Sequence, residues 1–246
     1  MTVILLRHGR STANTALTLA GRTPGVGLDD TGHAQAAELG RRLGELPVEA
    51  VVRSPLMRCR QTVEPLARSL GVEPLVDEGL VEVDYGSWTG RPLKDLASEH
   101  LWSVVQQHPS SAVFPDGESL AGMAGRAVTA IRRHDQRLAE EADRDVLWVA
   151  CSHGDVIKAV IADAYGMHLD QFQRIVVEPA SVSTTIRWNW WNPRRCPWSG
   201  TRHTARSCSG STTPAATWRV SAGTRPAGSA TPRRGTPART PSPAGT

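Results

Sequence analysis

Two histidines, each followed by glycine, stand where an apolar stretch of the sequence gives way to polar residues. His8 follows the apolar residues 3–6 and Arg7, and His153 follows the apolar residues 146–151. Glycine lets backbone N–H groups approach a ligand, and arginine offers a charged fork of donors. This combination suits an oxyanion, most naturally phosphate. The first motif alone fits a solvent-facing turn equally well, but its repetition favours one pocket shared by both histidines.

The elements that must position these histidines follow from the periodicity of the apolar residues. Apolar runs predict strands over residues 3–6, 48–52, 74–76, 146–151 and 180–186. Helical spacing predicts helices from Asp30 or Thr31 to Pro47, from 56 to Gly71, over 118–142 and over 154–165. The alternation predicts an α/β three-layer sandwich, with a mostly parallel central sheet flanked by helices. In such sheets ligands bind at the carboxyl ends of the strands, which is where both histidines stand.

Composition narrows the class of protein. Of the 246 residues, 39% are hydrophobic, which is enough for a sizeable core. No apolar run approaches the ~18 residues of a membrane-spanning helix, so we expect no membrane association. Residues 1–6 lack a basic leader, and four widely spaced cysteines fit neither a disulfide framework nor a zinc site. We therefore expect a cytoplasmic protein.

The end of the chain differs from the rest in composition. All 24 acidic residues lie at or before Glu178, whereas ten arginines and five of the eight tryptophans follow residue 183, without any lysine or leucine. We predict a domain over residues 1–187 and a basic tail rich in Pro, Thr, Arg and Trp over 188–246. Such a tail cannot bury enough apolar surface to offset its chain entropy, so we expect disorder. The abrupt change also suits a reading-frame error in a GC-rich gene.

Further motifs occur in an order that resembles the histidine phosphatase superfamily, over about residues 1–183. The resemblance is to the phosphoglycerate-mutase-like branch, and within it to small actinobacterial members of the acid phosphatase type. The motifs that carry it are Arg7-His8-Gly9-Arg10-Ser11 with Asn14, Gly21-Arg22, Leu28-Asp29-Asp30-Thr31-Gly32, Arg53-Ser54-Pro55-Leu56-Met57-Arg58, Glu82-Val83-Asp84-Tyr85-Gly86, Phe114-Pro115-Asp116-Gly117-Glu118-Ser119 and Ser152-His153-Gly154.

The resemblance implies a phosphoglycerate-mutase-like fold and catalysis through a phosphohistidine. His8 would be the nucleophile and Glu82 the proton donor, with His153, if cationic, as a further donor to the phosphate. The phosphate-binding residues would be Arg7, Arg58, Ser11 and Asn14. No metal and no other cofactor is implied, because the basic cluster supplies the positive charge.

Several positions leave alternatives open. Arg60 shares a predicted helix with Arg58, so one of them faces solvent, and we favour Arg58 in the pocket. Asp84 is the alternative to Glu82. Arg53 stands where the family usually has a small residue, and it is either an extra phosphate contact or a charge at a strand end. The histidines without a partner pattern are expected at the surface: His33, His100, His108, His134 and His168.

These observations predict a metal-independent phosphomonoester hydrolase that acts on small phosphorylated metabolites. The alternative is a cofactor-dependent phosphoglycerate mutase, but such mutases carry a long Arg-rich insertion after the Glu82 region. Here the residues between Glu82 and Phe114 include only Arg91 and Lys94 as basic residues besides histidine. A third hypothesis is non-specific nucleic-acid binding through the basic tail. Because the tail shows no folded module, we expect no specific nucleic-acid partner, and a homodimer is left open.

Overall fold

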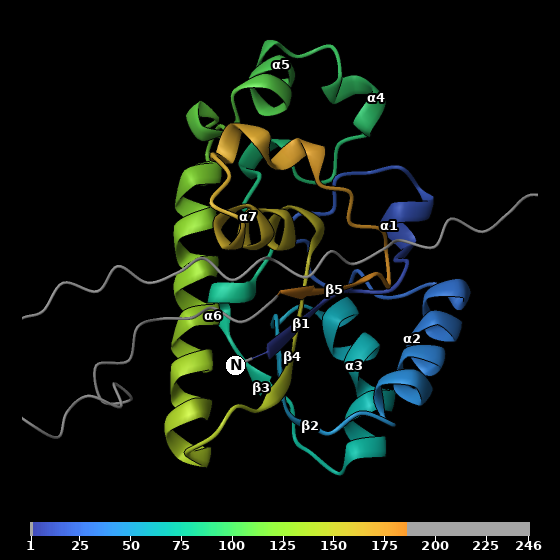
Figure 1. The fold of residues 1–246 in the computed structure, drawn as a ribbon. Coiled ribbons are helices and arrows are strands. Elements are labelled where there is room, and N and C mark those ends of the chain that lie inside the picture. Colours follow the sequence, from blue (N-terminus) through green and yellow to red (C-terminus); the bar gives the residue numbers. More distant parts are fainter. Residues whose placement is uncertain (1, 186–246) are drawn as a thin grey trace, which may run out of the picture. The chain divides into compact units, whose positions relative to one another are not determined.

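One mixed sheet of five strands forms the centre of the domain in the computed structural model, which describes residues 2–185 (Figure 1). The strand order is β3-β2-β4-β1-β5; β5 runs antiparallel to β1, and the other neighbours are parallel. The strands are β1 Thr2–Arg7, β2 Val48–Arg53, β3 Leu75–Val76, β4 Leu147–Ser152 and β5 Val182–Thr185. The predicted, mostly parallel sheet is therefore confirmed.

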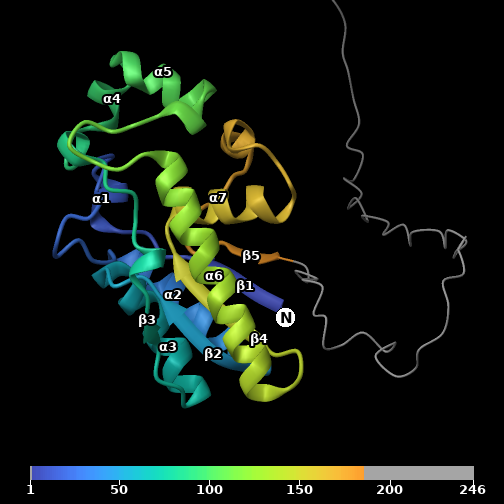
Figure 2. The ribbon, with the colours of Figure 1, turned by 90° about the vertical axis from the view of Figure 1, so that its left-hand side faces the viewer.

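Four helices cover the two faces of this sheet. Figure 1 shows α6 on one side of the strands and α2 and α3 on the other, and Figure 2 shows the same layers from the side. The pair α2 and α3 packs on one face, and the pair α6 and α7 on the opposite face. Their bounds are α2 Asp30–Leu43, α3 Met57–Leu70, α6 Leu120–Ala142 and α7 Gly154–Ala164. The predicted three-layer α/β sandwich is confirmed.

The alternation of side chains along β1 explains why both faces are covered. Ile4 and Leu6 are buried against α2 and α3, whereas Val3 and Leu5 are buried in the core that contains α6 and α7. A strand whose side chains are apolar on both faces needs a helical layer on each side. The continuous apolar run at the start of the sequence therefore explains why β1 lies between two layers of helices.

The helix boundaries lie close to the predicted ones. Gly71 ends α3 in the left-handed conformation, with a φ of 66°, as its type suggests. The helix α2 begins at Asp30, as predicted, but its N-cap is the preceding residue, Asp29, and not Asp30 or Thr31, which the sequence also made plausible as N-caps. The Asp29 carboxylate accepts the Gly32 N–H at 2.8 Å, which satisfies a donor of the first turn.

Several short helices were not predicted, and two of them lie beyond the end of the sheet, away from the strands (Figures 1 and 2). These two are α4 and α5, and α5 buries Val105. Segments of only one or two helical turns are too short to show a clear helical periodicity, which is why the sequence did not reveal them. The additional segments are α1 Thr12–Thr15, α4 Leu93–Leu96, α5 His100–Gln107, η1 Glu78–Leu80, η2 Gly86–Trp88, η3 Pro109–Ser111 and η4 Leu169–Arg174.

One expectation about the surface is wrong. His134 is only 8% exposed, and its Nε2 lies 2.5 Å from a carboxylate oxygen of Asp77, so this pair ties α6 to the segment after β3. His33, His100, His108 and His168 are exposed, as expected.

Other expectations stay predictions. The tail over 188–246, its reading-frame origin and the domain boundary at 187 lie outside the described residues. None of the helices in the part of the chain that the structure describes is both long and apolar enough to cross a membrane.

Candidate active site

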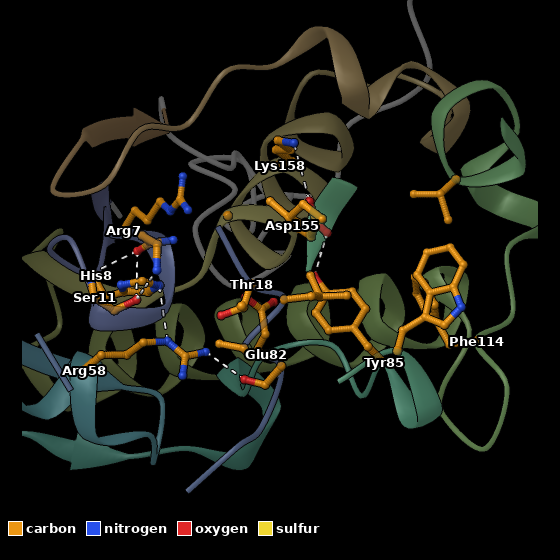
Figure 3. Close-up of a pocket in the computed structure, with 18 of the residues that line it drawn as sticks. Arg7, His8, Ser11, Thr18, Arg58, Glu82, Tyr85, Phe114, Asp155 and Lys158 are labelled. Carbon is orange, nitrogen blue, oxygen red and sulfur yellow. Dashed lines mark hydrogen bonds and ion pairs between the residues drawn. The ribbon is translucent and has the colours of Figure 1, made fainter. Parts of the chain in front are cut away.

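The ends of β1 and β4 bring the two histidines together. Arg7 pairs with Ser152 across the parallel strands, and the next residue, His8, donates its backbone N–H to the Ser152 carbonyl at 3.0 Å. The imidazole rings of His8 and His153 lie with their centroids 5.2 Å apart. A cavity of about 320 Å³ opens beside them (Figure 3). Six of the seven predicted site residues line this cavity, namely Arg7, His8, Ser11, Asn14, Arg58 and Glu82. The seventh, His153, is fully buried and is not a lining residue.

The hydrogen bonds of His8 define its protonation state. Its Nδ1 lies 2.7 Å from the Gly9 carbonyl oxygen, which can only accept, so Nδ1 carries the proton. The Arg58 Nε–H donates to His8 Nε2 at 3.3 Å, and a guanidinium can only donate. Nε2 therefore carries no proton, and its lone pair accepts the hydrogen bond from Arg58 Nε–H. This is the tautomer that a nucleophilic imidazole needs.

The electrostatic surroundings keep His8 neutral. Burial, and after it the positive charge of Arg58, lowers the pKa of His8 to about 3. A group with a lowered pKa stays deprotonated at every pH above that value. Nε2 therefore remains unprotonated throughout the physiological range, and its lone pair is occupied only by the hydrogen bond from Arg58.

Arg58 and Arg7 both hold buried donors that nothing in the described part of the chain satisfies. Arg58 is 1% exposed, whereas Arg60 on the same helix is exposed, so Arg58 is the arginine that reaches the cavity. Arg58 Nη1 and Arg7 Nε are buried without a hydrogen-bond partner among the described residues. Buried donors without partners are costly, and two of them on arginines beside one histidine suit an oxyanion.

His153 is held in one orientation from both ring nitrogens. Arg58 Nη2 lies 3.1 Å from Nδ1, so Nδ1 accepts, and Nε2 donates to Ser54 Oγ at 2.8 Å. Burial, and next the charge of Arg58, lowers the pKa of His153 well below its usual value. The expectation of a cationic His153 therefore does not hold in this structure, and its Nδ1 is an acceptor.

Glu82 lines the same cavity as His8, and one of its carboxylate oxygens lies 3.7 Å from His153 Nδ1. Burial, reinforced by the negative charge of Asp155, raises the pKa of Glu82 to about 7. A raised pKa keeps the carboxyl protonated up to neutral pH, which a general acid requires. The alternative carboxylate, Asp84, is not a lining residue, and it lies 3.7 Å from Arg22 at the surface.

A cluster behind Glu82, made of Arg126, Glu118 and Arg22, fixes the backbone that carries it. Arg126 donates to the Glu82 carbonyl at 3.1 Å, and Arg22 donates to the same carbonyl at 2.9 Å. Glu118 receives both guanidinium groups, and it also accepts the N–H of Asp84 at 2.9 Å. Arg126 was not predicted from the sequence, because one arginine in a long amphipathic helix carries no signal of its own.

The backbone N–H of Gly9, in the loop after His8, does not bind a ligand as the sequence suggested. The Gly9 N–H donates to Thr62 Oγ1 at 3.0 Å, so it is not free for a ligand. Glycine is required there for another reason, since a Cβ would meet the Gly32 carbonyl oxygen at 2.8 Å. Ser11 and Asn14 cap α1 reciprocally, and Asn14 Oδ1 accepts from the backbone and the hydroxyl of Ser11. The Asn14 amide group is therefore the donor that this pair offers to the cavity.

Arg53 is a charge at the end of a strand and not an extra phosphate contact. Its guanidinium donates to the Ser54 carbonyl at 3.1 Å, and it is not a lining residue of the cavity.

Two lining residues from the first turns of α7 escaped the sequence analysis. Asp155 accepts the hydroxyl of Tyr85 at 2.9 Å, and Lys158 lies 3.4 Å from the same carboxylate. Figure 3 shows both on the α7 side of the cavity, with Arg7, His8, Ser11 and Arg58 grouped at one end and Tyr85 and Phe114 at the other. Their position after a strand end in a parallel sheet was the signal that could have revealed them.

The described residues show no set of metal ligands. Across residues 2–185, no group of three or more His, Cys, Asp or Glu side chains has the arrangement to hold a metal ion. Metal independence stays a prediction, and chelation is its test.

Known proteins resemble this chain in sequence. The sequence model described as "Histidine phosphatase superfamily (branch 1)" matches residues 3–192. An acid phosphatase of Mycobacterium tuberculosis is 35% identical, over 73% of this chain and 83% of that protein. A probable phosphoglycerate mutase of Erwinia tasmaniensis is 29% identical, over 74% of this chain and 82% of that protein.

A solved structure shares the fold. A mycobacterial glucosyl-3-phosphoglycerate phosphatase is 24% identical and superposes with a TM-score of 0.67, covering 74% of this chain and 91% of that chain.

Proposed function

Because the chain belongs to branch 1 of the histidine phosphatase superfamily, we propose that it hydrolyses small phosphate monoesters through a phosphohistidine at His8. One juxtaposition carries the proposal. The neutral His8 Nε2 lies between two arginines whose buried Nε and Nη1 donors lack partners. A phosphoryl group placed there would satisfy both donors, and its oxygens would also take over the Arg58 Nε–H that His8 Nε2 now accepts, which frees the lone pair to attack phosphorus.

The first step transfers the phosphoryl group to the enzyme. His8 Nε2 forms a bond to phosphorus, and the bond from phosphorus to the alcohol oxygen breaks. Glu82 gives its proton to that oxygen, so the leaving group departs as an alcohol. The Nδ1–H bond to the Gly9 carbonyl, at 2.7 Å, stabilises the positive charge of the phosphorylated ring.

The second step returns the enzyme to its starting state. Water attacks phosphorus, and the Glu82 carboxylate accepts a proton from it. The bond from phosphorus to Nε2 breaks, which releases inorganic phosphate and neutral His8. Arg7 and Arg58 spread the charge of the transition state in both steps, so the mechanism asks for no metal ion.

The positions of the basic residues after Glu82 favour hydrolysis over the mutase alternative. Arg91 forms an ion pair with Glu99 at 2.7 Å, Lys94 is exposed, and neither lines the cavity. No Arg-rich clasp for a second phosphate therefore covers the described pocket.

The purified chain should release phosphate from p-nitrophenyl phosphate, with and without EDTA. It should interconvert 2- and 3-phosphoglycerate, in the presence of 2,3-bisphosphoglycerate, at no more than about a hundredth of its hydrolytic rate, because the cavity formed by residues 2–185 offers no second cluster of free cations for the bisphosphate. Mutase turnover that exceeds phosphate release would overturn the assignment as a hydrolase, and loss of activity with EDTA would overturn metal independence.

The pH profile should show the two titrating groups. For an alkyl phosphate, kcat/KM should be sustained below neutrality and should fall about tenfold per pH unit above the Glu82 pKa of about 7, because the proton donor is lost there. His8, with a pKa of about 3, should set the acidic limit. In Glu82→Gln the alkaline fall should disappear. An alkaline limb that is the same in wild type and Glu82→Gln would assign the titration to another group.

A further inference from the structure

The cavity continues beyond the phosphate-binding side chains into a compartment of different chemistry. Resting on the proposed function, we infer that this compartment binds the alcohol part of the substrate and selects flat, apolar alcohols that carry no second anionic group. We call it the alcohol compartment. The lining residues that define it are Leu19, Tyr85, Leu93, Trp102, Phe114 and Asp155.

A packed series of aromatic rings forms the wall of the alcohol compartment. Tyr85 meets Phe114 edge-on with centroids 4.9 Å apart, and Trp88 meets Phe114 at 5.4 Å. Trp88 then stacks on Trp102 of α5, with centroids 6.3 Å apart. Tyr85, Trp88 and Phe114 are each at most 5% exposed, so the wall is held by the core before any substrate arrives. A preformed apolar wall favours a ligand with a flat apolar face.

Three apolar side chains remain partly open toward the cavity. Leu19, Leu93 and Trp102 are only half-buried, although all three pack against the main core. They come from the loop after α1, from α4 and from α5, the segments beyond the end of the sheet. Apolar surface that is still open in a concave site gains free energy when an apolar group covers it. The alcohol of a preferred substrate is therefore expected to lie against these side chains.

The charges in the cavity are arranged against a second anion. Among the lining residues, the cations are Arg7, Arg58 and Lys158, and the two arginines stand at the phosphate end. Lys158 lies 3.4 Å from the Asp155 carboxylate and donates to Gln173 at 3.1 Å, so its charge is already compensated. A carboxylate on the substrate would meet Asp155 and a paired ammonium in a partly dehydrated site, where like charges repel strongly.

Two matched pairs of substrates test the inference without changing the type of leaving group. Ethyl phosphate and 2-phenylethyl phosphate are both esters of primary alcohols, and they differ by an apolar ring. Glycerol 1-phosphate and 3-phosphoglycerate differ by the replacement of a hydroxymethyl group with a carboxylate. In wild type, kcat/KM should be about tenfold higher for 2-phenylethyl phosphate within the first pair and for glycerol 1-phosphate within the second.

Variants assign each preference to its residue. Trp102→Ala should bring the kcat/KM ratio of 2-phenylethyl phosphate to ethyl phosphate close to one and leave the ratio of glycerol 1-phosphate to 3-phosphoglycerate unchanged. Asp155→Asn should leave the first of these ratios unchanged and bring the second close to one. Both members of a pair are measured at one pH, so any change in the Glu82 pKa cancels from the ratio. The control is Leu101→Ala, which removes an apolar side chain from the same helix outside the cavity lining and should preserve both ratios.

The wild-type ratios decide the inference even if a variant fails to fold. If p-nitrophenyl phosphate is hydrolysed but either ratio is close to one or reversed, the inference is wrong and the proposed function stands. If neither p-nitrophenyl phosphate nor any of the four esters is hydrolysed, the proposed function is wrong and the inference falls with it.

Discussion

Replacing His8 by alanine should lower phosphatase turnover by at least about 10⁴-fold, because the covalent route then loses its nucleophile. The wild-type chain, mixed with substrate and quenched in alkali after milliseconds, should carry one phosphoryl group on His8, detectable by mass spectrometry. Alkali is required because the phosphorus–nitrogen bond of phosphohistidine hydrolyses in acid. His8→Ala should carry none.

The matched control is His33→Ala, which removes an exposed histidine from the nearby helix α2. It should keep wild-type turnover and the same labelling of His8. A phosphoryl group trapped on His153 would overturn the assignment of the nucleophile. So would turnover by a folded His8→Ala chain within about tenfold of wild type.

The second large effect concerns Glu82, and it should depend on the leaving group. Glu82→Gln should lower the phosphorylation rate of alkyl phosphates by about 10²- to 10⁴-fold, because an alkoxide leaves poorly without a proton. The loss with p-nitrophenyl phosphate should stay within about tenfold, since nitrophenolate is a stable anion. Rapid-quench measurement of the first turnover isolates this step from hydrolysis of the phosphoenzyme.

Asp84→Asn serves as the control, because Asp84 lies near Glu82 in sequence but faces Arg22 outside the cavity. It should leave the ratio between the two classes of substrate unchanged. Equal losses for alkyl and nitrophenyl esters in Glu82→Gln would argue that Glu82 has a structural role only, and a selective loss in Asp84→Asn would transfer the acid role to that residue.

Periodicity and local chemistry predicted the elements that carry the site. The apolar runs before Arg7 and His153 became neighbouring parallel strands, and the helix that follows β2 buries Arg58 rather than Arg60. These features are encoded locally, since the apolar side chains of each element decide which of its faces is buried.

The features that the sequence did not reveal depend on contacts between distant residues. Arg126 stabilises the carbonyls of residues 79, 81 and 82 from a helix far along the chain. His134 is buried because Asp77 accepts its ring nitrogen, and neither residue alone distinguishes this pair from two surface groups. The neutral state of His153 likewise arises from three different segments, through Arg58, Ser54 and the enclosing core.

The pairing of β1 with strands made later has a consequence for folding during translation. The strand β1, which precedes His8, is made before its partners β4 and β5, and the Ala180 N–H donates to the His8 carbonyl. Such non-local pairing makes folding slow, and domains fold as the chain emerges from its N-terminus. A nascent chain that has not reached Ala180 holds both histidines but lacks the partner that closes the backbone at His8. We therefore expect the proposed activity to be acquired late in translation, and products interrupted before this point should be inert.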